Sequence, residues 1–146
     1  MNERTTQNNW KEFAESNGYR FEASSESIIH GIITEFKILE GDELIVHSKF
    51  AKTNSAFNHQ WIIVKSKNVG EAWGSGTFKA GIFNSIFPKS DPKKALNSLL
   101  RSNGAKELRV DQDRISIKFR NIPETQNELK QIINLMEKVK TAGNKT

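Results

Sequence analysis

The spacing of hydrophobic residues first predicts a short helix near the start of the chain. Its apolar face is formed by Trp10, Phe13 and Ala14, which stand three and four positions apart. Asn8 or Asn9 can cap the beginning of this helix, and Gly18 stands where a left-handed residue commonly follows the end of one. We therefore expect a helix between these limits, with residues 1–8 as a flexible end.

Hydrophobic residues alternate with polar ones over residues 19–66. β-Branched and aromatic residues are frequent there, and a period of two is typical of strands with one buried face. The pattern predicts a meander of antiparallel strands at about 19–23, 28–33, 36–39, 43–51 and 56–66. Three serines, Ser24, Ser25 and Ser27, fall between two of these strands, so we expect a loop there.

Helical spacing returns in the second half of the chain. Asp91 as N-cap and Pro92 in the first turn predict a helix that ends at Gly104. Residues 106–120 alternate again and predict a β-hairpin. The predicted helix between Asp91 and Gly104 has an apolar stripe that consists of Ala95, Leu96, Leu99 and Leu100.

The last helix is indicated by a capping box, in which Thr125 precedes Glu128 by three positions. Its apolar face consists of Leu129, Ile132, Ile133, Met136 and Val139. We expect it to end before Gly143, with residues 143–146 as a second flexible end.

Strand registers follow from the rule that opposed residues share one face of a sheet. The pairs expected in the first hairpin are Phe50 with Phe57, Val46 with Trp61 and Leu44 with Ile63. This register leaves residues 52–55 as a polar loop. The pairs expected in the second hairpin are Val110 with Ile115 and Leu108 with Ile117, which set Glu107 opposite Lys118.

Together these elements predict an α+β fold of one domain, residues 1–146. An antiparallel sheet, built from residues 19–66 and the 106–120 hairpin, would carry helices packed on one face. The alternative is a bent sheet or partly open barrel closed by the C-terminal helix, similar to pleckstrin-homology-like domains.

The composition excludes several kinds of chemistry but does not identify a function. The chain contains no cysteine, which excludes thiol catalysis, cysteine-ligated metals and disulfides. His47 and His59 lie on neighbouring predicted strands, but the expected register turns them to opposite faces. We find no sequence motif for a metal, a phosphate loop or a serine nucleophile, so we expect no cofactor and lean against an enzyme.

The net charge of +5 is unevenly distributed. Residues 1–70 hold 8 basic and 9 acidic residues, whereas residues 71–146 hold 14 and 8. A basic region at 79–120 next to aromatic residues has the composition of a single-strand nucleic-acid binder.

The segment at 69–90 combines glycines with aromatic residues, and a further strand at about 77–83 is expected in it. Buried aromatics would complete the core over the sheet, whereas exposed ones would form a partner surface. The candidate binding residues are Trp73, Phe78, Phe83, Phe87, Lys79 and Lys89.

The opening pattern W-x-x-F-A-x-x-x-G-x-x-F, from Trp10 to Phe21, is followed by Gly31 and by Phe36-Lys37-Ile38. This arrangement resembles a set of uncharacterised bacterial α+β domains, and the resemblance implies no activity. A turn is expected at Thr34 and Glu35, where such domains have a second glycine. The element order is also similar to the two-layer fold class of type III secretion chaperones.

The leading functional hypothesis is a non-enzymatic domain that binds a protein or peptide through its sheet face or residues 70–87. The alternatives are nucleic-acid binding through residues 79–120, and a small-ligand-binding protein or enzyme without a recognisable motif. We expect a cytoplasmic location, because the sequence shows neither an apolar leader nor a membrane span. The oligomeric state stays open.

Overall fold

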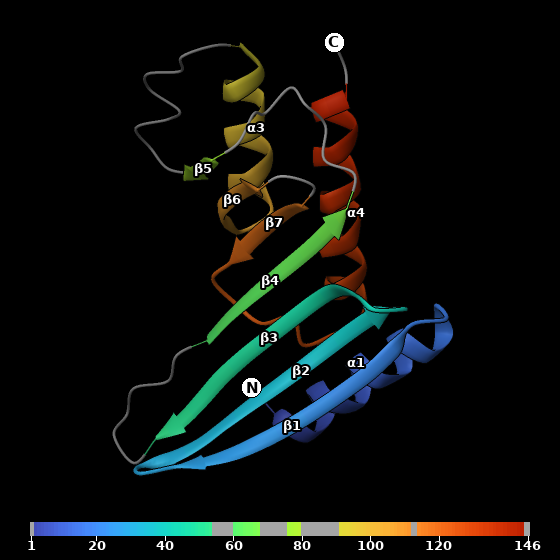
Figure 1. Cartoon of the computed structure of the whole chain (residues 1–146), viewed down its shortest axis with the longest axis vertical. Coiled ribbons are helices and arrows are strands. Elements are labelled where there is room, and N and C mark those ends of the chain that lie inside the picture. Colours follow the sequence, from blue (N-terminus) through green and yellow to red (C-terminus); the bar gives the residue numbers. More distant parts are fainter. Residues whose placement is uncertain (1, 54–59, 68–75, 80–90, 112–113, 145–146) are drawn as a thin grey trace.

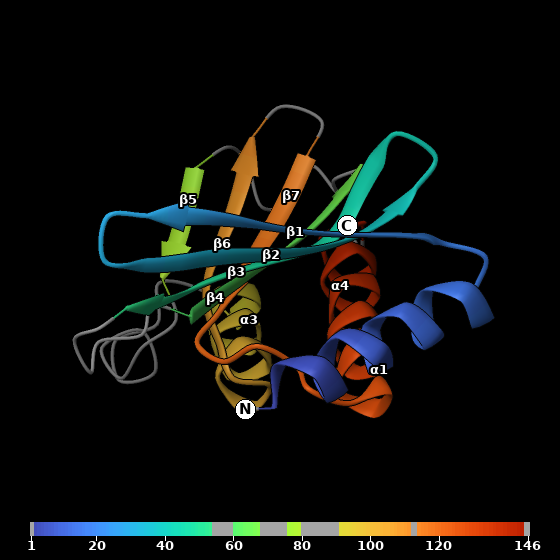
Figure 2. The same ribbon diagram turned by 90° about the horizontal axis from the view of Figure 1, so that it is seen from below.

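The computed structural model describes residues 2–53, 60–67, 76–79, 91–111 and 114–144. Seven strands form one open antiparallel sheet in the order β1-β2-β3-β4-β7-β6-β5, and the described helices cover one of its faces (Figures 1 and 2). The elements are α1 (Glu3–Ser16), β1 (Arg20–Ile28), β2 (Gly31–Glu40), β3 (Glu43–Thr53), β4 (Gln60–Lys67), β5 (Gly76–Lys79), α3 (Asp91–Ser102), β6 (Ala105–Asp111), β7 (Arg114–Phe119) and α4 (Gln126–Asn144).

This arrangement confirms the predicted α+β fold with an antiparallel sheet and helices on one face. The sheet is open and does not close into a barrel. Each half of the sheet is built from strands that follow one another along the chain, β1 to β4 and β5 to β7. The two halves meet where β4 pairs with β7.

Helix α1 begins earlier than the sequence predicted. Asn2 caps it, and the Asn2 side-chain oxygen accepts a hydrogen bond from the backbone N–H of Thr5 at 3.0 Å. Residues 3–8 therefore form the first turns of α1, and Thr6 is buried. Hydrophobic spacing missed these turns because Thr6 is the one residue among them that faces the core. The end of α1 was predicted correctly, since Gly18 follows it with a φ of 74°.

Strands β1 and β2 are longer than expected, and two predicted turns are wrong. The serines at 24, 25 and 27 lie inside β1, and Thr34 and Glu35 lie inside β2. Ser25 is paired with Thr34, and their hydroxyl oxygens lie 3.3 Å apart. Cross-strand partners of this kind let polar side chains occupy the middle of a strand.

The β3–β4 register differs from the expected one by three positions. Phe50 pairs with Gln60 and Val46 with Val64, so Trp61 and Ile63 turn away from the helices. The predicted pairing of Phe50 with Phe57 is wrong. Residues 61–64 are all apolar, so the hydrophobic pattern allows either pair of alternate residues to face the helices. The pairing of Ile62 and Val64 with buried residues of β7 is compatible with only one of these two arrangements.

The β6–β7 hairpin has the predicted register. Val110 pairs with Ile115, Leu108 with Ile117 and Glu107 with Lys118. Strand β5 occupies part of the region where a strand was expected, and it pairs with β6 at the sheet edge. Gly104, with a φ of 72°, follows α3 as predicted. Gly143, expected beyond the last helix, belongs to α4.

The core lies between the sheet and the helices. Trp10 is fully buried in it, with its ring centroid 5.7 Å from that of Phe36. The indole N–H of Trp10 donates a 2.7 Å hydrogen bond to the carbonyl of Pro123, in the loop before α4. Trp10 therefore joins α1 to β2 and to the start of α4. The same core leaves the opposite sheet face without any described helix (Figure 2).

Candidate functional site

Three isoleucines project at the tip of the β1–β2 hairpin. Ile29 is 92% exposed, Ile32 48% and Ile28 38%. The turn between the strands consists of Ile29 and His30 alone, because Ile28 pairs with Gly31. Two-residue hairpin turns favour Asn, Asp and Gly, so an isoleucine here is not explained by turn formation. We name Ile28, Ile29 and Ile32 the isoleucine tip.

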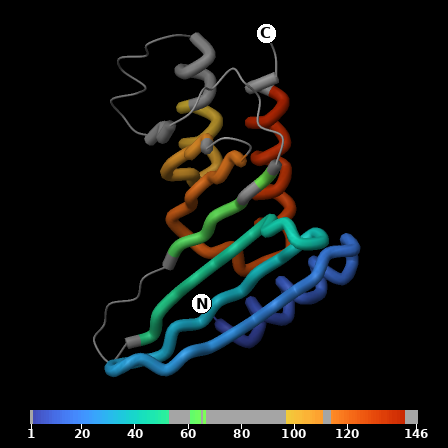
Figure 3. Tube along the Cα trace, in the orientation of Figure 1, coloured from blue at the N-terminus to red at the C-terminus, as the bar shows by residue number. Residues whose placement is uncertain are grey.

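The isoleucine tip continues into a free sheet edge. Strand β1 pairs with β2 on one side, and it is the first strand in the order of the sheet. All nine of its residues except Phe21 are exposed. Figure 3 shows that the hairpin reaches the end of the sheet farthest from α4. An apolar tip and a run of unpaired backbone groups therefore lie side by side.

The charges next to the isoleucine tip balance each other. Lys52, which pairs with Ile32, lies 3.0 Å from Glu3. A Glu3 oxygen also accepts a 3.3 Å hydrogen bond from the hydroxyl of Thr34. An anionic membrane surface attracts segments with an excess of Lys and Arg. The surroundings of the tip hold no such excess among the described residues, which favours a protein partner over a membrane.

The uncovered sheet face carries a charged cluster around Glu35. Its carboxylate lies 3.2 Å from His47 Nε2 and 3.7 Å from the ammonium groups of both Lys37 and Lys49. Partial burial alone would raise the pKa of Glu35, but the His47 hydrogen bond and the nearby positive charges outweigh it and lower the pKa. Glu35 is therefore held ionised, and its charge offsets that of the lysines.

Trp61 lies beside this cluster. Its ring centroid is 5.7 Å from that of His47 in an edge-on arrangement, and the Lys49 ammonium lies 5.6 Å from it. The shifted β3–β4 register is what brings Trp61 to this face. His59, expected on the opposite face from His47, lies outside the described residues. Sequence reasoning did not identify Glu35 and Trp61 as the neighbours of His47.

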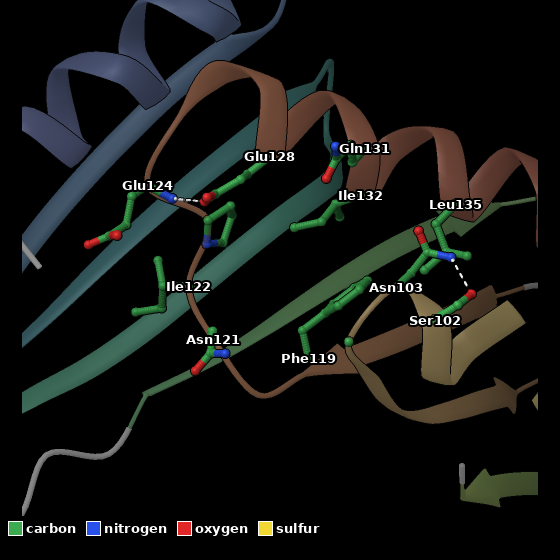
Figure 4. A pocket seen from close by; sticks show the side chains of 12 residues that line it. Ser102, Asn103, Phe119, Asn121, Ile122, Glu124, Glu128, Gln131, Ile132 and Leu135 are labelled. Atoms are coloured by element: carbon green, nitrogen blue, oxygen red, sulfur yellow. Dashed lines mark hydrogen bonds between the residues drawn. The ribbon is translucent and has the colours of Figure 1, made fainter. Parts of the chain in front are cut away.

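A groove of about 600 Å³ lies between the α3–β6 turn and the start of α4 (Figure 4). Its floor is apolar and buried, and consists of Phe119, Ile122, Ile132 and Leu135. Its rim carries amides, a serine and two glutamates, namely Asn103, Asn121, Gln131, Ser102, Glu124 and Glu128. The polar groups of the rim determine what the groove can bind.

Part of that rim serves the structure of the helices. The Glu128 side chain accepts a 2.6 Å hydrogen bond from the backbone N–H of Glu124 (Figure 4). The Glu128 N–H donates to the Thr125 hydroxyl at 3.2 Å. This confirms the predicted capping box, except that the glutamate reaches one residue further back. The Asn103 amide likewise donates to the carbonyl of Leu99 at 2.8 Å. The Asn103 amide and the Glu128 carboxylate are therefore already hydrogen-bonded to the backbone at the ends of these helices, and a ligand would have to compete with those bonds.

A smaller hollow of about 230 Å³ lies between β3, β4 and α4. Tyr19 lines it, and burial with the nearby carboxylates of Glu40 and Glu137 raises the pKa of Tyr19. Lys140 lies 3.6 Å from Glu137. No group of three metal-ligating side chains occurs in the part of the chain that the structure describes.

The predicted binding residues are only partly placed. Phe78 and Lys79 belong to β5, where their backbones pair with Leu108 and Glu107. Trp73, Phe83, Phe87 and Lys89 lie outside the described residues. The structure brings together three members of the predicted basic region, Arg109, Arg114 and Lys118, on the uncovered face of β6 and β7.

The isoleucine tip was missed by sequence reasoning. The sequence predicts one strand at 28–33, which contains all three residues of the tip, because isoleucine favours strands and the serines before it favour loops. A usable signal was present in the run Ile28-Ile29-His30-Gly31-Ile32-Ile33, which is apolar at every position but two. Such a run fits a strand buried on both faces, and β1 and β2 have one face exposed.

No described helix is long and apolar enough to cross a membrane. Compared with known proteins, the chain matches no family model, no curated protein and no solved structure. The function must therefore be argued from the surface of this fold.

Proposed function

We propose that this protein is a non-enzymatic interaction domain that binds a protein or peptide through the isoleucine tip. The observation that carries the proposal is the 92% exposure of Ile29 between two further exposed isoleucines. Full burial of the exposed Ile29 side chain would stabilise a complex by roughly 1.5–3 kcal/mol, and the partly buried Ile28 and Ile32 would each add less. Contiguous exposed apolar residues on a domain surface commonly mark a partner site.

Site-specific photo-crosslinking tests this proposal. A photoreactive amino acid replaces Ile29 in one variant and Asp42 in a control, because Asp42 is exposed in the two-residue β2–β3 turn. We expect a discrete crosslinked product from position 29 and none of that mass from position 42. The product should disappear when Ile28→Asp and Ile32→Asp are introduced as well. Equal products from both positions, or a product that survives these changes, would contradict the proposal.

The uncovered sheet face supports a second candidate, single-stranded nucleic-acid binding. Phosphates could bind there to three basic side chains, those of Arg109, Arg114 and Lys118. The partly exposed ring of Trp61 lies on the same face. This candidate ranks second because Glu35 and Glu107 offset two or more of the neighbouring positive charges. It predicts that a mixed oligonucleotide binds at low salt and that affinity falls steeply as salt rises. Unchanged binding after Arg109, Arg114 and Lys118 are replaced by Ala would eliminate it.

A further inference from the structure

Strand β1 presents an edge that lacks most of the usual protection against pairing. Its nine residues, Arg20–Ile28, pair with β2 without a register shift and include no proline and no lysine. The middle of the strand carries only small side chains, those of Ala23, Ser24 and Ser25. Native edge strands are commonly blocked by bulges, prolines or lysines, which keep other chains from pairing with them. Every second N–H and C=O of β1 faces away from β2, and no strand among the described residues pairs with them.

We infer that β1 accepts an extended peptide segment of a partner by strand addition, with the isoleucine tip as the anchor at one end. This inference rests on the proposed function and specifies its partner. Main-chain hydrogen bonds along an edge supply affinity in such complexes, and alternate side chains supply specificity. Ile28 is the last residue of β1 and Ile29 follows it in the turn, so a single extended segment can contact both the edge of β1 and this part of the isoleucine tip.

Helix α1 argues against a second copy of this chain as the occupant. Figure 2 shows α1 directly beneath the β1 side of the sheet, and α1 packs against both β1 and β2. Two β1 strands paired edge to edge would lie about 4.8 Å apart, and each would bring its own α1 beneath it. Packed helices need about 8–10 Å between their axes. A segment that carries no helix on that side avoids this contact, and it therefore fits the edge of β1 better than a second copy does.

Side chains on the outer face of β1 indicate the chemistry of this segment. Arg20 and Glu22 lie 3.3 Å apart and neutralise each other. Glu26 has no ion-pair partner among the described residues, and Ile28 is the next residue on the same face. The matching segment carries Lys or Arg opposite Glu26 and an apolar residue opposite Ile28. In an extended peptide these two residues stand two positions apart.

A matched pair of proline variants tests the edge directly. Successive N–H groups of a strand point to opposite sides, so one of Ser24 and Ser25 donates toward β2 and the other toward solvent. Proline is tolerated in an edge strand where the lost N–H faces solvent. Of Ser24→Pro and Ser25→Pro, we expect one variant to keep the thermal stability of the parent and one to lose it. The stable variant removes a donor from the free edge alone.

The probe is a peptide selected with the purified full chain from a displayed library of random peptides, about a dozen residues long, then synthesised with a fluorophore. We expect the stable proline variant to weaken its binding about tenfold or more, and Ile29→Asp to do the same. Glu26→Lys should weaken binding too, and a peptide with Glu in place of its basic residue should restore it.

The alternative outcomes separate the inference from the proposed function. If the stable proline variant binds the peptide as the parent does while Ile29→Asp does not, strand addition is wrong and the isoleucine tip remains the site. If no peptide is enriched but position 29 still gives its specific crosslink, strand addition is again wrong. If the chain dimerises and the stable proline variant is monomeric, the occupant is a second copy and the inference is overturned. If both the peptide and the crosslink are absent, both ideas fail.

Discussion

Two hairpin turns of equal length show opposite chemistry in this sheet. The β2–β3 turn consists of Gly41 and Asp42, and Gly41 has the positive φ of 61° that such turns require. The β1–β2 turn consists of Ile29 and His30, which are poor choices for the same task. Both turns are exposed, and both close on strand β2. The first turn suits the fold, whereas the second retains an apolar residue that the fold does not need.

The difference teaches where to look for function in a chain without recognisable motifs. Ile29 departs from the residue preference of two-residue hairpin turns, whereas Gly41 in the next turn follows it. A residue that departs from such a preference points to a requirement other than stability. The following experiments test whether the two turns really differ in this way.

The largest effect is expected at Trp10, which supports both hairpins through Phe36 in their shared strand β2. Trp10→Ala removes a fully buried ring and its hydrogen bond to Pro123. We expect a loss of about 3–5 kcal/mol in the free energy of unfolding, measured by urea denaturation. Trp10→Phe keeps most of the packing and should cost less. A loss below about 1 kcal/mol for the alanine variant would mean that the hairpins do not depend on this ring.

The next effect separates the two turns. Gly41→Val forces a β-branched residue into a left-handed conformation and should cost about 1–2 kcal/mol. Ile29→Val, at the corresponding end of β2, should leave the melting temperature unchanged, because the side chain is 92% exposed. Thermal unfolding by circular dichroism measures both. Equal losses in the two variants would remove the contrast.

A third experiment exchanges the chemistry of the β1–β2 turn. Ile29→Asn combined with His30→Gly installs the preferred turn residues, and we expect a gain of about 0.5–1 kcal/mol in stability. The same variant should lose the crosslink to the partner and the binding of the selected peptide. A variant that is more stable and still binds would show that the isoleucine tip has no role in recognition.

The smallest effect is expected in the middle of β2, far from either turn. Glu35→Gln removes the charge that Lys37, Lys49 and His47 surround, and should cost less than about 1 kcal/mol at neutral pH. Because the pKa of Glu35 is lowered in the folded protein, its contribution is present above the ordinary carboxyl range and is lost as pH falls through the lowered value. The parent and variant should therefore converge in acid. A difference that grows as pH falls would contradict the assigned direction.

The elements differ in how far sequence alone determined them. The β6–β7 register was predictable because Leu108, Val110, Ile115 and Ile117 alternate with polar residues on both strands, so one register buries them all. The β3–β4 register was not, because residues 61–64 are apolar at every position and the deciding partner, β7, lies far along the chain. Helix α4 and its cap were predictable, since their signals are local.

The candidate site was the least predictable part. Local propensity predicts a loop at the serines of β1 and one strand over residues 28–33, whereas the structure has the serines inside β1 and a turn at Ile29 and His30. Ser25 is held in the strand by Thr34 of the next strand, and Thr34 by Glu3 of α1, which lies 31 positions earlier in the sequence. Propensity describes what a residue favours alone, and it contains no information about such partners.

The single junction between β4 and β7 also has a consequence for the order in which the protein folds. Strands β1 to β4 pair with their neighbours in sequence, whereas Ile62 pairs with Phe119, which lies 57 positions further along the chain (119 − 62). Contacts between distant segments carry the larger loop-closure cost and form late. We therefore expect the β1–β3 amides to gain protection from hydrogen exchange before those at the β4–β7 junction. The strand offered to a partner would then be complete while the other half of the sheet is still closing.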